Sequence, residues 1–71
     1  MLKNIKSNIP IKAGDVLDLT IEAMGGKGDG IAKIEGYVVF IPRTAVGEKV
    51  QAKIVRTLPK MAFAEALQTL Q

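Results

Sequence analysis

Residues Gly25 to Pro42 have the sequence Gly-Gly-Lys-Gly-Asp-Gly-Ile-Ala-Lys-Ile-Glu-Gly-Tyr-Val-Val-Phe-Ile-Pro. The first six positions contain four glycines, which disfavour the interior of a helix or strand. Ile31 to Ile34 then predicts a short strand, and Glu35-Gly36 predicts a two-residue turn. Tyr37 to Ile41 is rich in β-branched and aromatic residues and predicts a second strand, which Pro42 ends. We therefore expect a flexible basic loop that leads into a tight β-hairpin.

Strands are also predicted on both sides of this hairpin. After a turn at Gly14-Asp15, apolar residues alternate with polar ones, which is typical of a half-buried strand: Leu17, Leu19, Ile21 and Ala23 share one face, and Asp18, Thr20 and Glu22 the other. Alternation returns from Lys49 to Thr57 after turn signals at 43–48. In this segment Val55 interrupts the polar face, which indicates a bulge, a barrel closure or an exposed apolar spot.

The last segment, Met61 to Gln71, is ambiguous because its residues have high helix propensity. We predict a strand, since the segment follows a turn at 58–60, its alanines alternate with larger residues, and four strands alone would leave open edges. Five short strands with glycine-rich turns predict an all-β fold, a small five-stranded antiparallel β-barrel of the OB-like or SH3-like size class. The predicted barrel domain covers residues 14–71, and residues 1–13 form a loose N-terminal arm.

Composition excludes several classes of function. The chain of 71 residues is a single small domain without cysteine or histidine. Disulfide frameworks, zinc–thiolate sites and the commonest nucleophile–base pairs are therefore excluded. The seven carboxylates are scattered, without a pair in an apolar segment and without calcium-loop spacing. We expect no enzyme activity, no metal and no other cofactor.

Charge and hydropathy limit the environment of the chain. No apolar run approaches the roughly 18 residues of a membrane span. Met1 to Lys12 contains no signal-peptide core. We therefore expect a cytoplasmic protein with no membrane partner. The net charge is +3 and the sequence pI is about 9.5. A small basic domain suits nucleic acid, an anionic surface or an acidic partner, and charge alone does not choose among them.

The glycine-rich loop does not match a nucleotide-binding motif. Gly26 to Gly30 contains no Gly-Lys-Ser/Thr and leads into a strand, whereas phosphate loops lead into the N-terminus of a helix. Two interpretations are open. The glycines supply positive φ for a sharp turn that Asp29 caps, or their N–H groups and Lys27 also contact phosphate.

Basic residues interleaved with aromatic ones form the remaining candidate site. In small barrels that bind single strands, exposed aromatics stack on bases while cations follow the backbone. Tyr37 and Phe40 have opposite parity in one strand, and we expect Tyr37, next to the turn, to be exposed and Phe40 to lie in the core. Phe63 should point outward if the neighbouring alanines point inward. The candidate contacts to a single strand are Lys27, Lys33, Tyr37, Phe40, Arg43, Lys60 and Phe63.

Four segments in order resemble the TRAM domain family, most closely its stand-alone archaeal members. The resemblance extends from Asp15 to Leu70 and rests on residues 25–33, 36–42, 46–50 and 62–66. It implies a five-stranded OB-like barrel that binds RNA with low sequence specificity and acts as an RNA chaperone, similar in role to cold-shock proteins. In larger members the domain accompanies enzymes that methylate or methylthiolate tRNA and rRNA. The contacts that the resemblance implies are Lys33, Tyr37, Phe40 and Phe63.

The partner predicted on these grounds is RNA, in single-stranded regions or in structured tRNA, rRNA or mRNA, with single-stranded DNA as a further ligand, and the protein is expected to be a monomer. A second interpretation stays open. An SH3-like barrel with apolar residues such as Val55 and Met61 on its surface would instead act as an adaptor that docks on a translation or RNA-modification enzyme.

Overall fold

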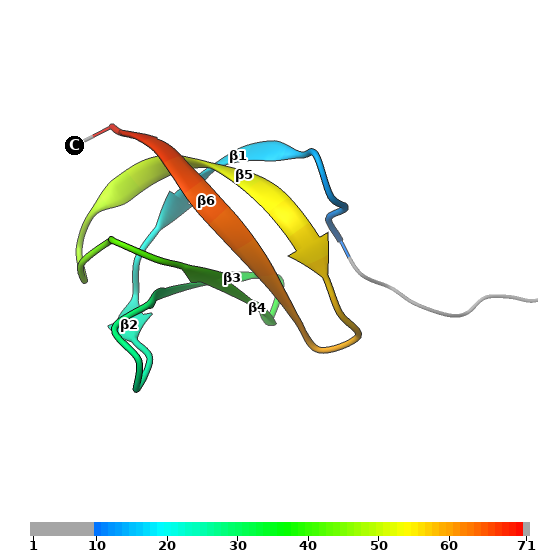
Figure 1. Ribbon diagram of the computed structural model, residues 1–71, viewed down its shortest axis with the longest axis horizontal. Coiled ribbons are helices and arrows are strands. Elements are labelled where there is room, and N and C mark those ends of the chain that lie inside the picture. Colours follow the sequence, from blue (N-terminus) through cyan, green and yellow to red (C-terminus); the bar gives the residue numbers. More distant parts are fainter. Residues whose placement is uncertain (1–9, 71) are drawn as a thin grey trace, which may run out of the picture.

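The computed structural model describes residues 10–70, and their regular secondary structure consists of β-strands joined by turns and short loops. The strands form one curled sheet in the order β1-β5-β6-β4-β3-β2 (Figure 1). The predicted all-β barrel class is thereby confirmed. Residues 1–9, which make up most of the predicted arm, and Gln71 lie outside the described residues. The strands are β1 (Val16–Thr20), β2 (Ala23–Met24), β3 (Gly30–Ile34), β4 (Tyr37–Ile41), β5 (Lys49–Thr57) and β6 (Met61–Thr69).

The described residues contain six strands where the sequence predicts five. The difference arises because the predicted first strand is divided at Ile21 and Glu22 into β1 and β2. Ile21 exchanges backbone hydrogen bonds with the segment before β5, through Glu48 and Gly47, whereas the N–H of Glu22 donates to the carbonyl of Ile31 in β3. One continuous segment thus pairs with opposite ends of the sheet. This change of partner bends the segment and curls the sheet into a barrel.

One strand pair departs from the predicted antiparallel arrangement. β4 and β6 run parallel, with Val38 opposite Met61 and Phe40 opposite Phe63, whereas the other four pairs are antiparallel. The chain reverses direction twice between β4 and β6, once before β5 and once after it, so β6 returns in the direction of β4. This long-range pairing brings the central hairpin against the last strand.

The local predictions for the hairpin and for β5 are confirmed. Glu35 and Gly36 have φ values of 51° and 83°, as a two-residue turn with left-handed central residues requires. β5 has the predicted bounds, and its register with β6 shifts between Ile54 and Arg56. Val55, which lies at this shift, is 49% exposed, so it marks both a bulge and an exposed apolar spot.

The core lies inside the curled sheet and contains small as well as branched side chains. Ala62 and Ala64 point inward from β6 and are almost fully buried. β6 lies between β5 and β4 in the sheet (Figure 1), and its small inward side chains leave interior volume for the branched side chains of neighbouring strands. Ile11, from the described part of the N-terminal segment, is also buried in this core.

Candidate nucleic-acid interface

The outer face of the sheet carries a row of residues from four neighbouring strands. Cross-strand partners point to the same face of a sheet. Ile31 of β3 lies opposite Phe40 of β4, Phe40 lies opposite Phe63 of β6, and Phe63 lies opposite Arg56 of β5. Two aromatic rings therefore stand between an aliphatic side chain and a guanidinium group.

The two phenylalanine rings are packed against each other on this face. Their centroids are 5.7 Å apart and their planes are inclined by 25°. Phe63 points outward, opposite to the buried alanines of β6, as predicted. The prediction that Phe40 lies in the core is wrong, because Phe40 is half-buried on the outer side while Val39 and Ile41 point inward. Both rings keep exposed surface on which a base can stack.

The prediction that Tyr37 is exposed is also wrong. It is 9% exposed and belongs to the core, because it shares the inward face of β4 with Val39 and Ile41. Its hydroxyl group donates to the backbone carbonyls of Leu58 and Met61, so the buried phenol has hydrogen-bond partners. The ring of Tyr37 therefore does not belong to the exposed aromatic surface.

A groove of about 230 Å³ lies beside the two rings. Its lining is mostly apolar and consists of Gly25, Gly26, Lys27, Asp29, Phe40, Met61 and Phe63. A side chain at Gly25 would contact Phe40 and Ile31, so the absence of a side chain there keeps the groove open. The glycine-rich loop thus forms one wall and β4 with β6 form the other.

The loop itself is a tight turn between β2 and β3. The N–H of Gly25 donates to the backbone carbonyl of Asp29 at 2.7 Å, and Gly28 has a φ of +87°. The predicted need for positive φ is confirmed. The predicted cap is wrong in one respect, because the turn is closed by the backbone of Asp29 and, within residues 10–70, no hydrogen bond reaches its carboxylate.

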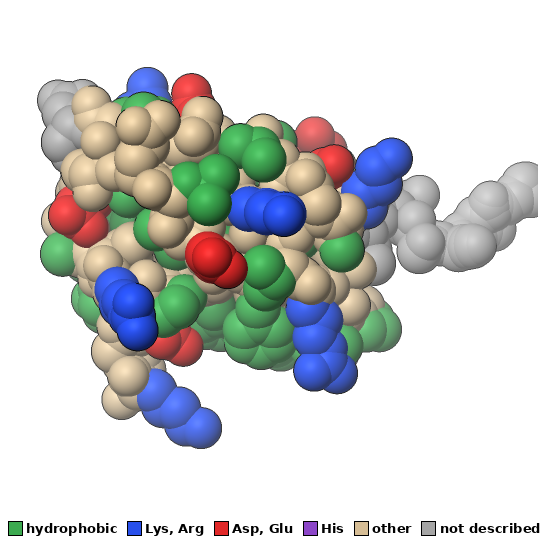
Figure 2. All heavy atoms as spheres, turned by 45° about the horizontal axis from the view of Figure 1, so that its top comes forward, with side chains coloured by type: hydrophobic (Ala, Val, Ile, Leu, Met, Phe, Trp, Pro, Cys, Tyr) green, Lys and Arg blue, Asp and Glu red, His purple; other side chains and the backbone are tan. Residues whose placement is uncertain are grey.

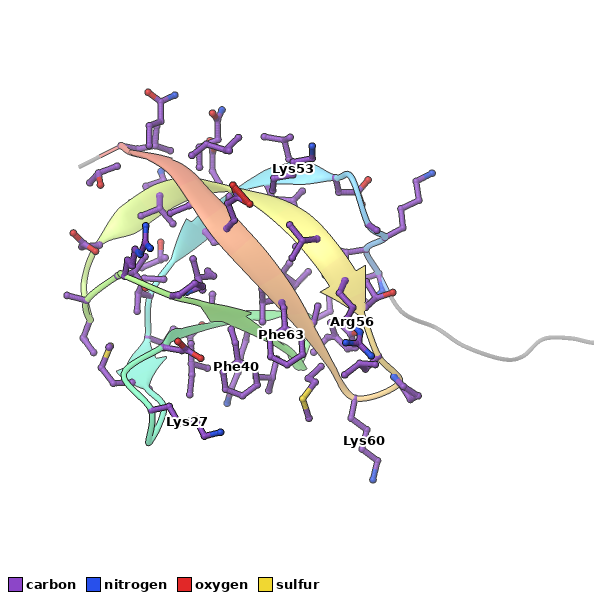
Figure 3. All side chains as sticks on the ribbon, in the orientation of Figure 1. Lys27, Phe40, Lys53, Arg56, Lys60 and Phe63 are labelled. Atoms are coloured by element: carbon purple, nitrogen blue, oxygen red, sulfur yellow. The ribbon has the colours of Figure 1, made fainter. Side chains whose placement is uncertain are left out.

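Cations surround the aromatic pair. Figure 3 shows Lys27 on the loop near Phe40 and Arg56 near Phe63, whereas Lys60 extends away from the rings at the β5–β6 turn. Lys33 is exposed on the same outer face, opposite Val38, which in turn lies opposite Met61. Figure 2 shows hydrophobic side chains on one face with Lys and Arg side chains spread around them and Asp or Glu side chains among them.

Two predicted contacts lie apart from the groove. Arg43 is exposed, has a φ of 66°, and borders a separate hollow with Pro42, Glu65 and Ala66. Lys60 borders a further hollow near the Glu35-Gly36 turn, and it reaches the aromatic face only from the tip of the β5–β6 turn. Lys27, Lys33, Phe40 and Phe63 are the predicted residues that the fold brings together.

Sequence reasoning missed Arg56 and the groove position of Met61. The turn is shorter than the predicted 58–60: Leu58 pairs with Met61 across Pro59-Lys60, which sets Thr57 opposite Ala62 and Arg56 opposite Phe63. Counting back from the predicted turn would have set Arg56 opposite Ala62, one position away from the ring. The position of Met61 in the groove depends on the parallel pairing of β6 with β4, which has no local signal.

Two features that would indicate other kinds of site are missing from the described part of the chain. Residues 10–70 contain no group of three or more Asp, Glu, His or Cys side chains with the arrangement of a metal site. They also contain no helix of the length and hydropathy needed to cross a membrane.

The sequence model of the TRAM domain matches residues 10–67. An uncharacterized protein of Methanocaldococcus jannaschii is 49% identical over 63 residues, which are 89% of this chain and 82% of that protein. A solution structure of a conserved protein from Methanococcus maripaludis superimposes with a TM-score of 0.83 at 42% identity, covering 93% of this chain and 94% of that one.

Two similar proteins are much longer than this chain. Translation initiation factor 2 subunit beta of Methanothrix thermoacetophila is 45% identical over 58 residues, which are 82% of this chain and 28% of that protein. Ribosomal RNA large subunit methyltransferase E of Methanocella arvoryzae is also 45% identical over 58 residues, which are 82% of this chain and 23% of the enzyme. In both cases the similarity covers one domain-sized part of the longer protein.

Proposed function

This chain belongs to the TRAM domain family, and we propose that it is a non-catalytic protein that binds unpaired RNA on the outer face of β3, β4 and β6. TRAM domains are generally RNA-binding modules, and similar sequences occur within a translation factor subunit and a ribosomal RNA methyltransferase. The observation that carries the proposal is the half-buried, outward-facing pair Phe40 and Phe63, which lies at the edge of an apolar groove with cations nearby.

The binding mechanism combines stacking with charge. A base stacked on an aromatic side chain contributes about 1–3 kcal/mol whatever its identity. Lys27, Lys33 and Arg56 then neutralise phosphates of the strand that runs across the face, which adds affinity without sequence information. The site needs neither ATP nor a metal, and it tolerates many sequences.

Preference for unpaired bases makes the protein an RNA chaperone. A base inside a duplex is already stacked on its neighbours and cannot reach the two rings. Binding therefore favours open strands and shifts the folding equilibrium of RNA by mass action. Unpaired regions of tRNA, rRNA and mRNA are the ligands that we propose, bound by a monomer in the cytoplasm, and single-stranded DNA offers the same stacking surface.

The test is a fluorescence anisotropy titration of a labelled single-stranded RNA with wild type and with the double variant Phe40→Leu, Phe63→Leu. Leucine keeps apolar volume on the sheet but removes both rings. We expect the affinity to fall at least about tenfold, which corresponds to the loss of one stacked base. Leu67→Ala, an exposed apolar residue of β6 outside the groove lining, is the control and should bind as wild type.

Val55 is 49% exposed, and this observation favours the adaptor function as a second candidate. The same titration separates the two. RNA binding that weakens with salt and depends on the rings supports the proposal, whereas no RNA binding by wild type at low salt would overturn it. In that case an apolar, salt-independent protein interface that includes Val55 becomes the better account.

A further inference from the structure

Arg43 has a backbone conformation that its residue type disfavours. Its φ is 66°, in the left-handed region, where a β-carbon crowds the backbone. Pro42 and Arg43 are the central residues of the turn after β4, with proline first and a positive φ second, as in a type II turn. The second central position of such a turn favours glycine or asparagine. Arginine at this position therefore strains the backbone, whereas glycine would not.

The neighbours of Arg43 hold the turn, whereas Arg43 itself is exposed. The ring of Pro42 restricts the backbone before it. After it, Thr44 is buried, and its Oγ1 donates to the carbonyl of Ile41 at 2.8 Å. Strained residues that the surrounding structure fixes cluster at functional and ligand-binding positions. The side chain of Arg43 is thus not needed to hold the turn, which favours a role in binding.

The turn lies at the end of the seam, the line along which β4 and β6 are neighbours. The two strands pair in parallel up to Phe40 and Phe63, and Pro42, which has no N–H to donate, begins the turn that leads the chain away. Positions 42 and 65 come two residues after the two rings, so they belong to the same outer face, about 7 Å further along the seam. A hollow of about 440 Å³ opens there, and its lining consists of Pro42, Arg43, Glu65 and Ala66.

Positive charge exceeds negative charge around this hollow. Glu65 is the acidic residue of the lining, and its strand β6 has β5 on one side and β4 on the other. From β5, Lys53 lies directly opposite Glu65, and opposite charges at such positions attract each other. Arg43 approaches from the end of β4. Because Lys53 offsets the carboxylate, Arg43 can bind an anion, and its planar fork of donors matches the oxygens of a phosphate group.

We propose that Arg43 binds a phosphate group of the RNA backbone, next to the nucleotide whose base stacks on Phe40 and Phe63. The bound strand then follows the seam of β4 and β6, from the rings to the hollow. Backbone strain at residue 43 is the consequence of placing a cation at this position. This inference rests on the proposed RNA binding and adds to it a further contact and a direction for the strand.

The experiment measures the fluorescence anisotropy of a labelled ten-nucleotide uridine oligomer at several salt concentrations, with wild type and with Arg43→Gly. Loss of one charged hydrogen bond should weaken binding about tenfold at low salt. The slope of log affinity against log salt should become shallower by about 0.7, which corresponds to one phosphate contact. Arg43→Gly should unfold at the same temperature as wild type or at a higher one, because glycine relieves the strain. Weaker binding by an equally stable protein is the expected signature.

Two variants serve as matched controls. Glu35→Gly relieves the strain at the other non-glycine residue of the range 10–70 that has a positive φ, 51°, and that lies at the β3–β4 turn outside the hollow. It should keep or raise the unfolding temperature without weakening RNA binding. Lys49→Gln removes one positive charge from β5, outside the linings of the groove and of the hollow, and should leave the slope nearly unchanged.

Glu65→Gln tests a structural alternative, in which Arg43 only pairs with Glu65. Removal of the carboxylate should strengthen RNA binding if Arg43 binds phosphate, since a repelling charge is lost. If instead Arg43→Gly and Glu65→Gln both lower the unfolding temperature and neither changes the affinity, Arg43 has a structural role and the assignment is wrong.

The outcomes separate this inference from the proposed function. Binding by Arg43→Gly with the affinity and slope of wild type would overturn the phosphate contact and leave RNA binding intact, and so would an equal change of slope in Lys49→Gln. Absence of binding by wild type at low salt would overturn both. Weaker and less salt-dependent binding by a stable Arg43→Gly, with both controls binding as wild type, would establish the contact.

Discussion

The hydroxyl group of Tyr37 donates a hydrogen bond to the backbone carbonyl of Met61, 2.6 Å away, although the two residues are 24 positions apart in the chain. The same hydroxyl group also donates to the carbonyl of Leu58. One buried side chain of β4 thus fixes the turn between β5 and β6. Because Met61 and Phe63 follow this turn directly, Tyr37 supports the aromatic face from behind.

Tyr37→Phe should destabilise the fold while keeping the shape of the core. The carbonyl of Leu58 would lose this donor, whereas the carbonyl of Met61 would still accept from the N–H of Leu58, so we expect a loss of about 0.5–1.5 kcal/mol. Urea denaturation should therefore show a lower midpoint with an unchanged slope. An unchanged midpoint would show that water replaces the hydroxyl group at no cost and that Tyr37 does not anchor the turn.

Gly30→Ala should be among the most damaging small substitutions. A Cβ at Gly30 would overlap the Oγ1 of Thr44, which is buried and bonded to the carbonyl of Ile41 at 2.8 Å. Overpacking of this kind costs about 1–3 kcal/mol. Gly26→Ala is the control, because its Cβ meets no atom within 4 Å, and it should change the free energy of unfolding by less than about 1 kcal/mol. Equal stability of the two variants in thermal unfolding would contradict the overlap.

Arg56→Gln should weaken RNA binding and reduce its salt dependence. Each phosphate contact of a single strand contributes about −0.7 to the slope of log affinity against log salt. Lys49→Gln removes the same charge from the other end of β5, about 23 Å away along the strand, and should leave the slope nearly unchanged. If both variants change the slope equally, only overall charge matters and Arg56 makes no defined contact.

Wild type should lower the melting temperature of an RNA hairpin that carries a fluorophore and a quencher at its ends. The expected direction follows from the preference of the two rings for unstacked bases. The variant Phe40→Leu, Phe63→Leu should lose most of this effect while its remaining cations still bind. A hairpin that melts at a higher temperature in the presence of the protein would show a preference for duplex and would contradict the chaperone role.

Much of the local structure was determined by the sequence alone. The positive φ that Glu35 and Gly36 adopt, the bounds of β5 and the placement of the β6 alanines on the face opposite Phe63 all follow from short-range rules. A glycine at a turn relieves a steric restriction within its own residue, and alternation along a strand is set by the geometry of the extended backbone. Such signals need no knowledge of distant neighbours.

Only the tertiary structure decided which side of β4 faces the core and what the outer side meets. Parity placed Tyr37 and Phe40 on opposite faces but did not say which face was inside, because either ring can be buried if its environment suits it. Val39 and Ile41 fill the interior, and the carbonyls of the β5–β6 turn accept from the phenol, so Tyr37 is buried and Phe40 is not. The contact of Phe40 with Phe63 exists because β4 and β6 pair in parallel. Since β5 lies between them in the sequence, this long-range pairing has no local signal.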